Sequence, residues 1–225
     1  MRVTVLGSGE AVPTARRSCA GYLVAWSARA VLLAASAGTY MRALKAGLEP
    51  RALSALALTH FHADHCADLP SLLQARRLAG LPPLPIAAPA GLSRLLAGFA
   101  AIFGAWVEEF ARPESYPFAL DGLSIRAFPA LHGQGSVSLR LEAEGKSLAY
   151  SGDTADCPGL REACRGADLA LLECTSARPM EGHMTPQDCA AVAAACGVGR
   201  LLLTHLGPDV ETGLPRAEDG LVVTV

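Results

Sequence analysis

The segment that most constrains the fold of this chain is a six-residue run, His60-Phe61-His62-Ala63-Asp64-His65. It comes directly after Ser54–Thr59, an apolar run that is typical of a buried strand. Proteins of the α/β class place functional side chains at the C-terminal ends of such strands. The run therefore predicts an α/β fold with a site at one edge of a sheet.

The remaining sequence alternates short β-like runs with helical ones, as an α/β fold requires. We expect strands at Arg2–Leu6, Gly21–Trp26, Ala30–Leu33, Ser54–Thr59, Ile86–Ala88, Leu123–Phe128, Ser136–Glu142, Ser147–Ser151, Leu169–Glu173 and Arg200–Thr204. We expect helices at Tyr40–Gly47, Asp68–Ala79 and Gly91–Phe110, and a last helix with Thr185 as N-cap, Pro186 at its first position and Gly197 after its end. No low-complexity linker divides the chain, so one domain over residues 1–225 is predicted.

The spacing within the histidine run is suited to two metal ions. Side chains two positions apart in an extended segment point the same way, so His60 and His62 can bind one ion. Asp64 and His65 follow as the chain turns and face another direction, which suits a second ion. Imidazole and carboxylate are ligands of zinc and neighbouring metals. The alternative is a polar cluster at a strand end without a metal.

Three further candidates for ligands follow other predicted strands: His132, Asp153 and His205. The segment Leu201–His205 repeats the L-x-L-T-H pattern of Leu56–His60. Taken singly, these residues have ordinary explanations as a loop histidine, a Gly-Asp turn and a core histidine. Their shared position at strand ends, together with the histidine run, favours a common metal site.

These separated motifs resemble the metallo-β-lactamase superfamily, in family order, over nearly the whole chain. The resemblance implies a four-layer αβ/βα sandwich with the site at one edge between two sheets. It also implies the ligand sets: His60, His62 and His132 for the first metal, Asp64, His65 and His205 for the second, and Asp153 bridging both.

The opening segment Leu6–Thr14 and the segment Gly182-His183-Met184-Thr185-Pro186 resemble ribonuclease Z-like members of this superfamily. The resemblance implies that a hydroxide held between two ions attacks the substrate, with Asp64 orienting it. We expect His183 to donate to the substrate oxygen, with Glu173 as its orienting partner; a local capping contact is the alternative.

Two arginines beside the opening motif, Arg16 and Arg17, are predicted to contact a substrate phosphate. A solvated surface pair is the alternative for both.

Three departures from the family pattern bear on the activity: the first predicts an impaired or specialised enzyme, and the other two argue against transfer RNA as the substrate. Ala34 stands where many members carry an acidic residue that supports the metal ligands. Only residues 133 to 152 separate His132 from Asp153, which leaves no room for a tRNA-binding arm. Leu206-Gly207-Pro208 after His205 differs from the tail of ribonuclease Z. A formal charge of −2 also provides no general attraction for a long polyanion.

The composition and the hydrophobic pattern exclude several other classes of protein. With 51% hydrophobic and 18% charged residues, the chain is not intrinsically disordered. The apolar stretch Leu95–Val107 has 13 residues and would rise about 20 Å as a helix, short of a bilayer core of about 30 Å. No signal-peptide pattern opens the chain, and the seven cysteines form no C-x-x-C pair. We therefore expect a cytoplasmic protein with reduced thiols and no membrane partner.

The sequence thus predicts a dinuclear metal-dependent hydrolase, foremost a phosphodiesterase acting on a small or nucleotide-like substrate. Zn²⁺ is the expected metal for both positions, with Mn²⁺ or Fe²⁺ as alternatives. An ester, lactone or thioester hydrolase of the same fold is the second hypothesis, and a weakly active metal-binding scaffold is the third. A homodimer is a further hypothesis from the resemblance.

Overall fold

Alternation of side chains along the strands divides the interior of the molecule into three apolar cores. In β10 (Lys146–Tyr150), Leu148 and Tyr150 face the core between two sheets, whereas Ala149 faces outward toward helices. The strand period of two residues produces this division, because successive side chains point to opposite faces. Two sheets that each bury both faces require a helical layer on each outer side.

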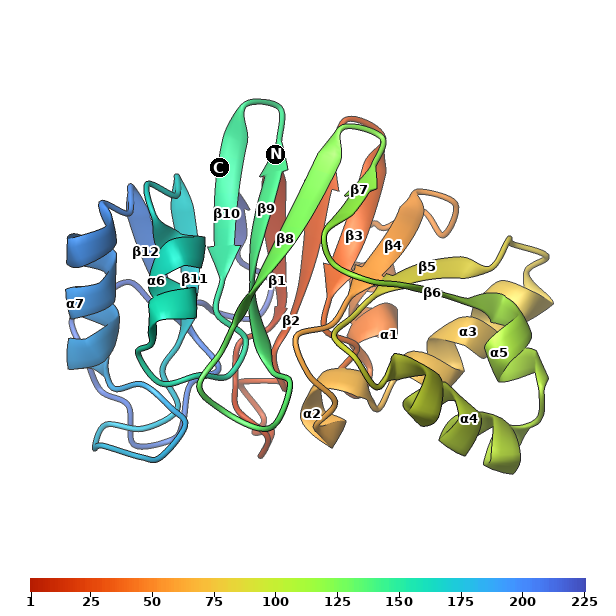
Figure 1. Ribbon diagram of the computed structural model, residues 1–225, viewed down its shortest axis with the longest axis horizontal. Coiled ribbons are helices and arrows are strands. Elements are labelled where there is room, and N and C mark those ends of the chain that lie inside the picture. The colour runs from red at the N-terminus through yellow and green to blue at the C-terminus, as the bar shows by residue number, and fades with distance from the viewer.

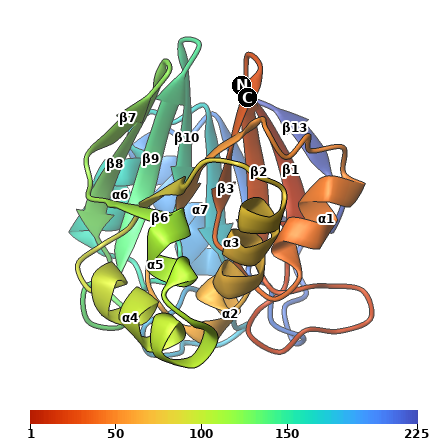
Figure 2. The same cartoon turned by 90° about the vertical axis from the view of Figure 1, so that its right-hand side faces the viewer.

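The computed structural model, which describes residues 1–225, has this architecture (Figure 1). Two sheets pack face to face, and helices cover both outer faces (Figure 2). The four-layer αβ/βα sandwich predicted from the sequence is confirmed. No helix has both the length and the apolar character needed to cross a membrane.

The first sheet has seven strands in the order β13-β1-β2-β3-β4-β5-β6. Strands β3 to β6 are parallel, and β13, β1, β2 and β3 pair in antiparallel fashion. Their bounds are β1 Arg2–Gly7, β2 Gly21–Trp26, β3 Arg29–Leu33, β4 Leu53–Ala57, β5 Leu84–Ala87, β6 Ala111–Glu114 and β13 Val222–Thr224.

The second sheet has six strands in the order β12-β11-β10-β9-β8-β7. Strands β10, β11 and β12 are parallel, and β7 to β10 form an antiparallel meander. The bounds not yet given are β7 Phe118–Leu120, β8 Leu123–Pro129, β9 Val137–Ala143, β11 Leu169–Glu173 and β12 Arg200–Thr204.

The helices belong to two outer layers. On the first sheet lie α1 (Thr39–Lys45), α3 (Leu69–Leu78), α4 (Leu92–Phe103) and α5 (Trp106–Phe110), with the short α2 (Ala63–Cys66) near the sheet edge. On the second sheet lie α6 (Pro158–Cys164) and α7 (Pro186–Cys196). The capping box between Thr185 and Asp188 and the left-handed Gly197 at the end of α7 are as predicted.

The structure differs from the sequence-based expectation in its smaller elements. The helical region predicted at Gly91–Phe110 is two helices, because the backbone at Gly104 leaves the helical conformation. Three short edge strands, β6, β7 and β13, and the helix α6 were not predicted. They have three to seven residues each, so they carry too little periodicity to be recognised.

Candidate metal centre

The histidine run follows β4 of the first sheet: His60 to His62 lie in the loop after the strand, and Ala63 to His65 lie in α2. His60 is buried three residues after the strand end, and His65 is fully buried on α2. The rings of His60 and His62 lie 4.7 Å apart and those of His60 and His65 lie 4.2 Å apart. The turn that α2 introduces after His62 therefore brings all three imidazoles together.

Three loops of the second sheet supply the other candidate ligands. His132 follows β8, Asp153 follows β10 and His205 follows β12 directly. Asp153 depends on Gly152, whose φ of +58° and close approach to the first sheet exclude a side chain. A Cβ atom there would lie 2.8 Å from the Cβ of Thr59. The contact of Gly152 with Thr59 thus brings loops of the two sheets to one edge.

The seven predicted side chains converge into two groups that share Asp153. The first ligand group is His60, His62, His132 and Asp153, and the second ligand group is Asp64, His65, Asp153 and His205. Within each group the candidate ligand atoms lie within 4.8 Å of one another. Such spacing fits side chains arranged around a single ion in each group.

The carboxylate of Asp153 divides its two oxygens between the groups. Its Oδ2 lies 3.8 Å from His60 Nε2 and 3.9 Å from His132 Nε2. Its Oδ1 lies 3.2 Å from His65 Nε2 and 3.5 Å from His205 Nε2. Asp64 Oδ2 lies 3.3 Å from the Nε2 atoms of both His65 and His205. A bridging carboxylate between two cations has this arrangement.

Several polar atoms at the centre of this cluster are buried without hydrogen-bond partners. They are His60 Nε2, His65 Nε2 and Asp153 Oδ1. Buried polar atoms in folded proteins are nearly always satisfied, so three together indicate a missing partner. Imidazole nitrogens and a carboxylate oxygen are the donor set that a borderline divalent metal takes. The residues present therefore fit a bound metal.

The electrostatics differ between the two groups. Burial, with the neighbouring His65, lowers the pKa of His60 to about 3, so His60 is neutral and free to act as a ligand. Burial also opposes a charge on His65, but Asp153 and Asp64 outweigh it and raise the pKa of His65 to about 10. The pKa of Asp64 is lowered: burial would raise it, but the hydrogen bond with His205 and the nearby imidazole of His65 prevail.

Hydrogen bonds orient three of the imidazoles from outside. Thr59 Oγ1 lies 3.0 Å from His60 Nδ1, and Thr175 Oγ1 lies 2.9 Å from His205 Nδ1. The carbonyl oxygen of Gly182 lies 3.2 Å from His132 Nδ1. Such contacts fix the ring that presents its other nitrogen to a metal. The sequence analysis missed all three. Thr59 was visible in the repeated L-x-L-T-H pattern and Gly182 in the segment Gly182–Pro186, although neither was predicted to orient a histidine; nothing local marked Thr175.

A sixth histidine borders the cluster. His183 lies with its ring centre 4.8 Å from that of His132 and 6.2 Å from that of His205. Its Nδ1 lies 2.7 Å from Oε1 of Glu173, the buried last residue of β11. The hydrogen bond to Glu173 raises the pKa of His183 against the effect of burial. All six histidines of the chain therefore gather in this one cluster.

Comparisons with known proteins agree with this geometry. Residues 18–206 match the family model described as "Beta-lactamase superfamily domain". The chain belongs to the β-lactamase superfamily. A ribonuclease Z of Mycolicibacterium gilvum is 30% identical over 95% of this chain and 86% of its own length. The chain is therefore a metal-dependent hydrolase.

Two solved structures share the metallo-β-lactamase fold with the chain. The metallo-β-lactamase fold protein YhfI from Bacillus subtilis has a TM-score of 0.87 at 22% identity and covers 99% of both chains. The short form of human tRNase Z has a TM-score of 0.84 at 24% identity, covering 100% of this chain and 99% of its own. These structures show the shared fold, and the 30% identical ribonuclease Z of Mycolicibacterium gilvum confirms the ribonuclease Z-like resemblance predicted from the sequence.

The structure shows the surroundings of Ala34, the position at which the resemblance led us to expect an acidic residue. Ala34 directly follows β3, and the next amide nitrogen, of Ala35, donates to the carbonyl oxygen of His65 at 2.7 Å. His65 Nδ1 is buried there without any hydrogen-bond partner. The second ligand group thus contains one imidazole that lacks an orienting contact.

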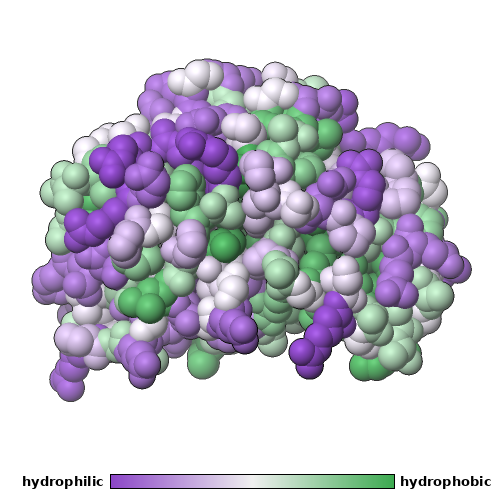
Figure 3. Space-filling model, viewed as in Figure 1, coloured by the Kyte–Doolittle hydropathy of each residue, from purple (hydrophilic) through white to green (hydrophobic).

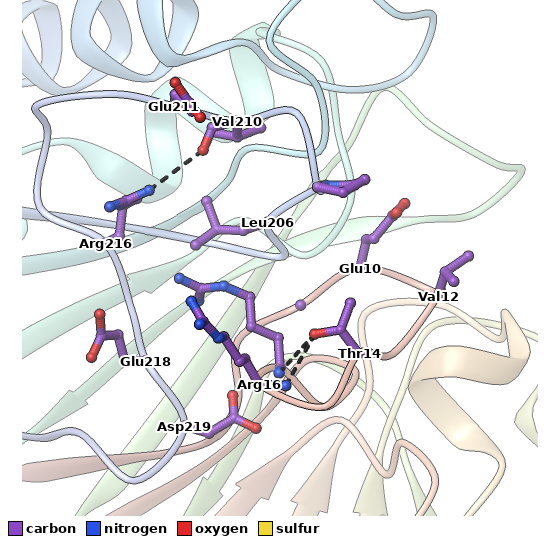
Figure 4. Close-up of a pocket in the computed structure, with 14 residues that line it drawn as sticks. Glu10, Val12, Thr14, Arg16, Leu206, Val210, Glu211, Arg216, Glu218 and Asp219 are labelled. Atoms are coloured by element: carbon purple, nitrogen blue, oxygen red, sulfur yellow. Dashed lines mark hydrogen bonds between the residues drawn. The ribbon is translucent and has the colours of Figure 1, made fainter.

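The two predicted phosphate contacts, Arg16 and Arg17, lie apart from the ligand cluster. Both line a cavity of about 830 Å³ between the opening loop and the segment after His205, and no candidate metal ligand lines it (Figure 4). Arg17 Nη1 donates to Ser8 Oγ and to the carbonyl oxygen of Ala217, both at 2.6 Å. Arg17 therefore connects the two ends of the chain, whereas the Arg16 side chain has no hydrogen bond within the protein.

Proposed function

We propose that this chain is a dinuclear metal-dependent phosphodiesterase that acts on small or nucleotide-like substrates. The observation that carries the proposal is the sharing of Asp153, whose two oxygens face two complete ligand groups. Zn²⁺ is the proposed metal at both positions, since imidazole and carboxylate ligands suit it. His60, His62 and His132 would hold one ion and Asp64, His65 and His205 the other, with Asp153 between them.

When bound, a pair of divalent ions activates water near neutral pH and polarises the phosphoryl oxygen. The protein residues supply orientation and proton transfer. Asp64, partly exposed at the cluster, accepts a hydrogen bond from the attacking water and directs it toward phosphorus. His183 donates a proton from Nε2 to the leaving oxygen, while its Nδ1–H donates to Glu173.

The position of Glu173 supports this role for His183. Besides the bond to His183, the carboxylate accepts hydrogen bonds from the Thr154 and Thr175 amides at 3.0 Å each and from the Thr175 hydroxyl at 2.8 Å. These bonds fix a negative charge behind the imidazole, which favours its protonated form. A protonated imidazole beside the metal cluster is suited to act as a general acid.

Two features support a small substrate. Residues 133 to 152 contain only two short turns and the strands β9 and β10, so no arm extends from this interval. The formal charge of −2 gives no general attraction for a polynucleotide. The relatives named ribonuclease Z support a phosphodiester rather than a carboxylic ester as the bond cleaved.

The direct test combines metal analysis with turnover of bis(4-nitrophenyl) phosphate and 4-nitrophenyl acetate. The proposal expects two ions per chain and a clear preference for the phosphodiester. Faster acetate hydrolysis would support an esterase instead, and two ions without turnover of either compound would support a scaffold. For His183→Ala we expect kcat to fall about hundredfold with metal content unchanged; a kcat within twofold of the original would remove the general-acid role.

A further inference from the structure

A groove of about 500 Å³ lies beside the histidine run, between Phe61 and α4. Leu95, Phe99 and Ile102 line it with apolar side chains, and Gly98 leaves its floor open, with nothing within 4 Å of an added Cβ atom. The concave form and the volume are typical of a site for a small ligand, for which roughly 300–1,000 Å³ is usual.

Helix α4 is unusually apolar for a helix at the surface. Only Ser93 and Arg94 among its residues are polar, yet only Leu92 and Leu96 are buried. Ile102 is 75% exposed. The surface is accordingly apolar at the lower right of Figure 3, where Figure 1 places α4. A contiguous exposed apolar surface with a hollow in it marks a binding site rather than ordinary surface.

The groove adjoins the ligand cluster through Phe61. Side chains alternate along the extended segment, so Phe61 points to the groove while His60 and His62 point to the cluster. A single stretch of backbone thus separates the groove from the first ligand group. Other apolar side chains are exposed beside the cluster as well: Leu131, next to His132, is 56% exposed.

One charged side chain, that of Arg94, lies among the apolar residues of the groove. Arg94 lines the groove and makes none of the ion pairs found among the arginines and lysines of the chain. An unpaired guanidinium at an apolar groove complements an anion that carries an apolar group. A phosphodiester esterified to an aliphatic or aromatic group has this combination.

We infer that the groove binds an apolar arm of the substrate, so that the enzyme prefers phosphodiesters bearing an aliphatic or aromatic group. The inference rests on the proposed phosphodiesterase function and narrows its substrate class. Phe61, Leu95, Phe99 and Ile102 exclude water from the arm, and Arg94 contacts a second anionic group of the substrate. The cleavage reaction itself stays at the metal cluster.

The test is a series of alkyl 4-nitrophenyl phosphates from methyl to hexyl, followed by the release of 4-nitrophenolate. We expect kcat/KM to rise about threefold to fourfold for each methylene that enters the groove, as burial of a methylene predicts. A flat series with measurable methyl ester cleavage would overturn the inference and leave the proposed function intact. Absence of cleavage for every member would instead contradict the proposed function.

A variant that fills the groove tests the location. Gly98→Leu places an isobutyl group on the groove floor, where the backbone tolerates a side chain, and Ala97→Leu adds the same group on exposed α4 surface outside the groove. We expect the hexyl-to-methyl ratio of kcat/KM to fall at least tenfold in Gly98→Leu and to stay unchanged in Ala97→Leu. An unchanged ratio in Gly98→Leu, with a dimer converted to monomer in light scattering, would show that the groove is an interface between copies and overturn the inference.

Discussion

The two ligand groups of the metal centre differ in how the protein supports them. In the first ligand group, His60 is held by the hydroxyl of Thr59 and His132 by the carbonyl of Gly182. In the second ligand group, His205 is held by Thr175, but His65 has a free Nδ1. The second group has instead an additional carboxylate, Asp64. The first group thus has two imidazoles held by outside hydrogen bonds, whereas His62 contacts only His132 of the same group; the second group has one such imidazole and a second carboxylate.

This difference has a consequence for metal loading. An imidazole with a hydrogen bond on one nitrogen is oriented before a metal binds. The ring of His65 has no such bond, so its orientation is fixed only when a cation replaces the proton on its metal-facing nitrogen. We therefore expect the two positions to respond differently to substitutions outside the ligand set and to pH. The predictions below test this asymmetry, beginning with the residue that both groups share.

Asp153→Asn removes the charge that both groups share, and we expect the largest effect. Metal content should fall from two ions to one or fewer per chain, and kcat/KM should fall more than hundredfold. Mass spectrometry of the metals and the phosphodiester assay measure both. Retention of two ions with near-normal activity would mean that Asp153 is not the bridge.

Thr59→Val and Thr175→Val form a matched pair, because each removes one hydroxyl that orients one imidazole. We expect each to weaken one metal position about tenfold to hundredfold, Thr59→Val the first and Thr175→Val the second. Competition titration with a chromophoric chelator resolves the two affinities. Equal weakening of both positions by each variant would break the distinction between the groups.

Ala34→Asp introduces the acidic residue that the family resemblance predicts to support the metal ligands, and we expect about tenfold tighter binding at the second position alone. The same chelator titration measures it, with Ala35→Ser as a control at the adjacent residue. Tighter binding at the first position, or none at either, would show that the free Nδ1 does not limit the site.

Metal binding should release protons unequally from the two groups. The pKa of His65, near 10, means that this imidazole is protonated at pH 7 to 9 without metal, whereas His60, with a pKa near 3, is neutral. Binding at the second position therefore releases one proton, and its affinity rises about tenfold per pH unit in this range, while the first stays nearly constant. Calorimetry in buffers of different ionisation enthalpy counts the protons; release from both positions equally would contradict the asymmetry.

The sequence predicted the candidate metal ligands better than the hydrogen bonds that orient them. His60, His62, Asp64 and His65 are adjacent along the chain, and the other candidates follow strands, so their strand-end positions were visible in the hydrophobic pattern. The orienting contacts of Thr175 and Gly182 join segments 30 and 50 residues away from their histidines. Thr175, Gly182, His205 and His132 all belong to loops of the second sheet, and which of these loops meet depends on the strand order rather than on a local pattern.

The same reason explains the smaller errors in the secondary structure predicted from the sequence. The long apolar run after Gly91 predicted one helix, whereas Gly104 with φ of 108° divides it. The groove beside α4 likewise depends on where this helix packs against Phe61. The apolar sequence of Leu95–Val107 does not indicate which of its side chains are exposed.

The account depends most on two cations held on either side of one carboxylate. Anomalous diffraction from crystals grown with excess Zn²⁺ tests this directly. We predict two peaks, one among His60, His62 and His132 and one among Asp64, His65 and His205, with Asp153 between them. A single peak, or peaks with His132 and His205 turned away from the centre, would contradict the account.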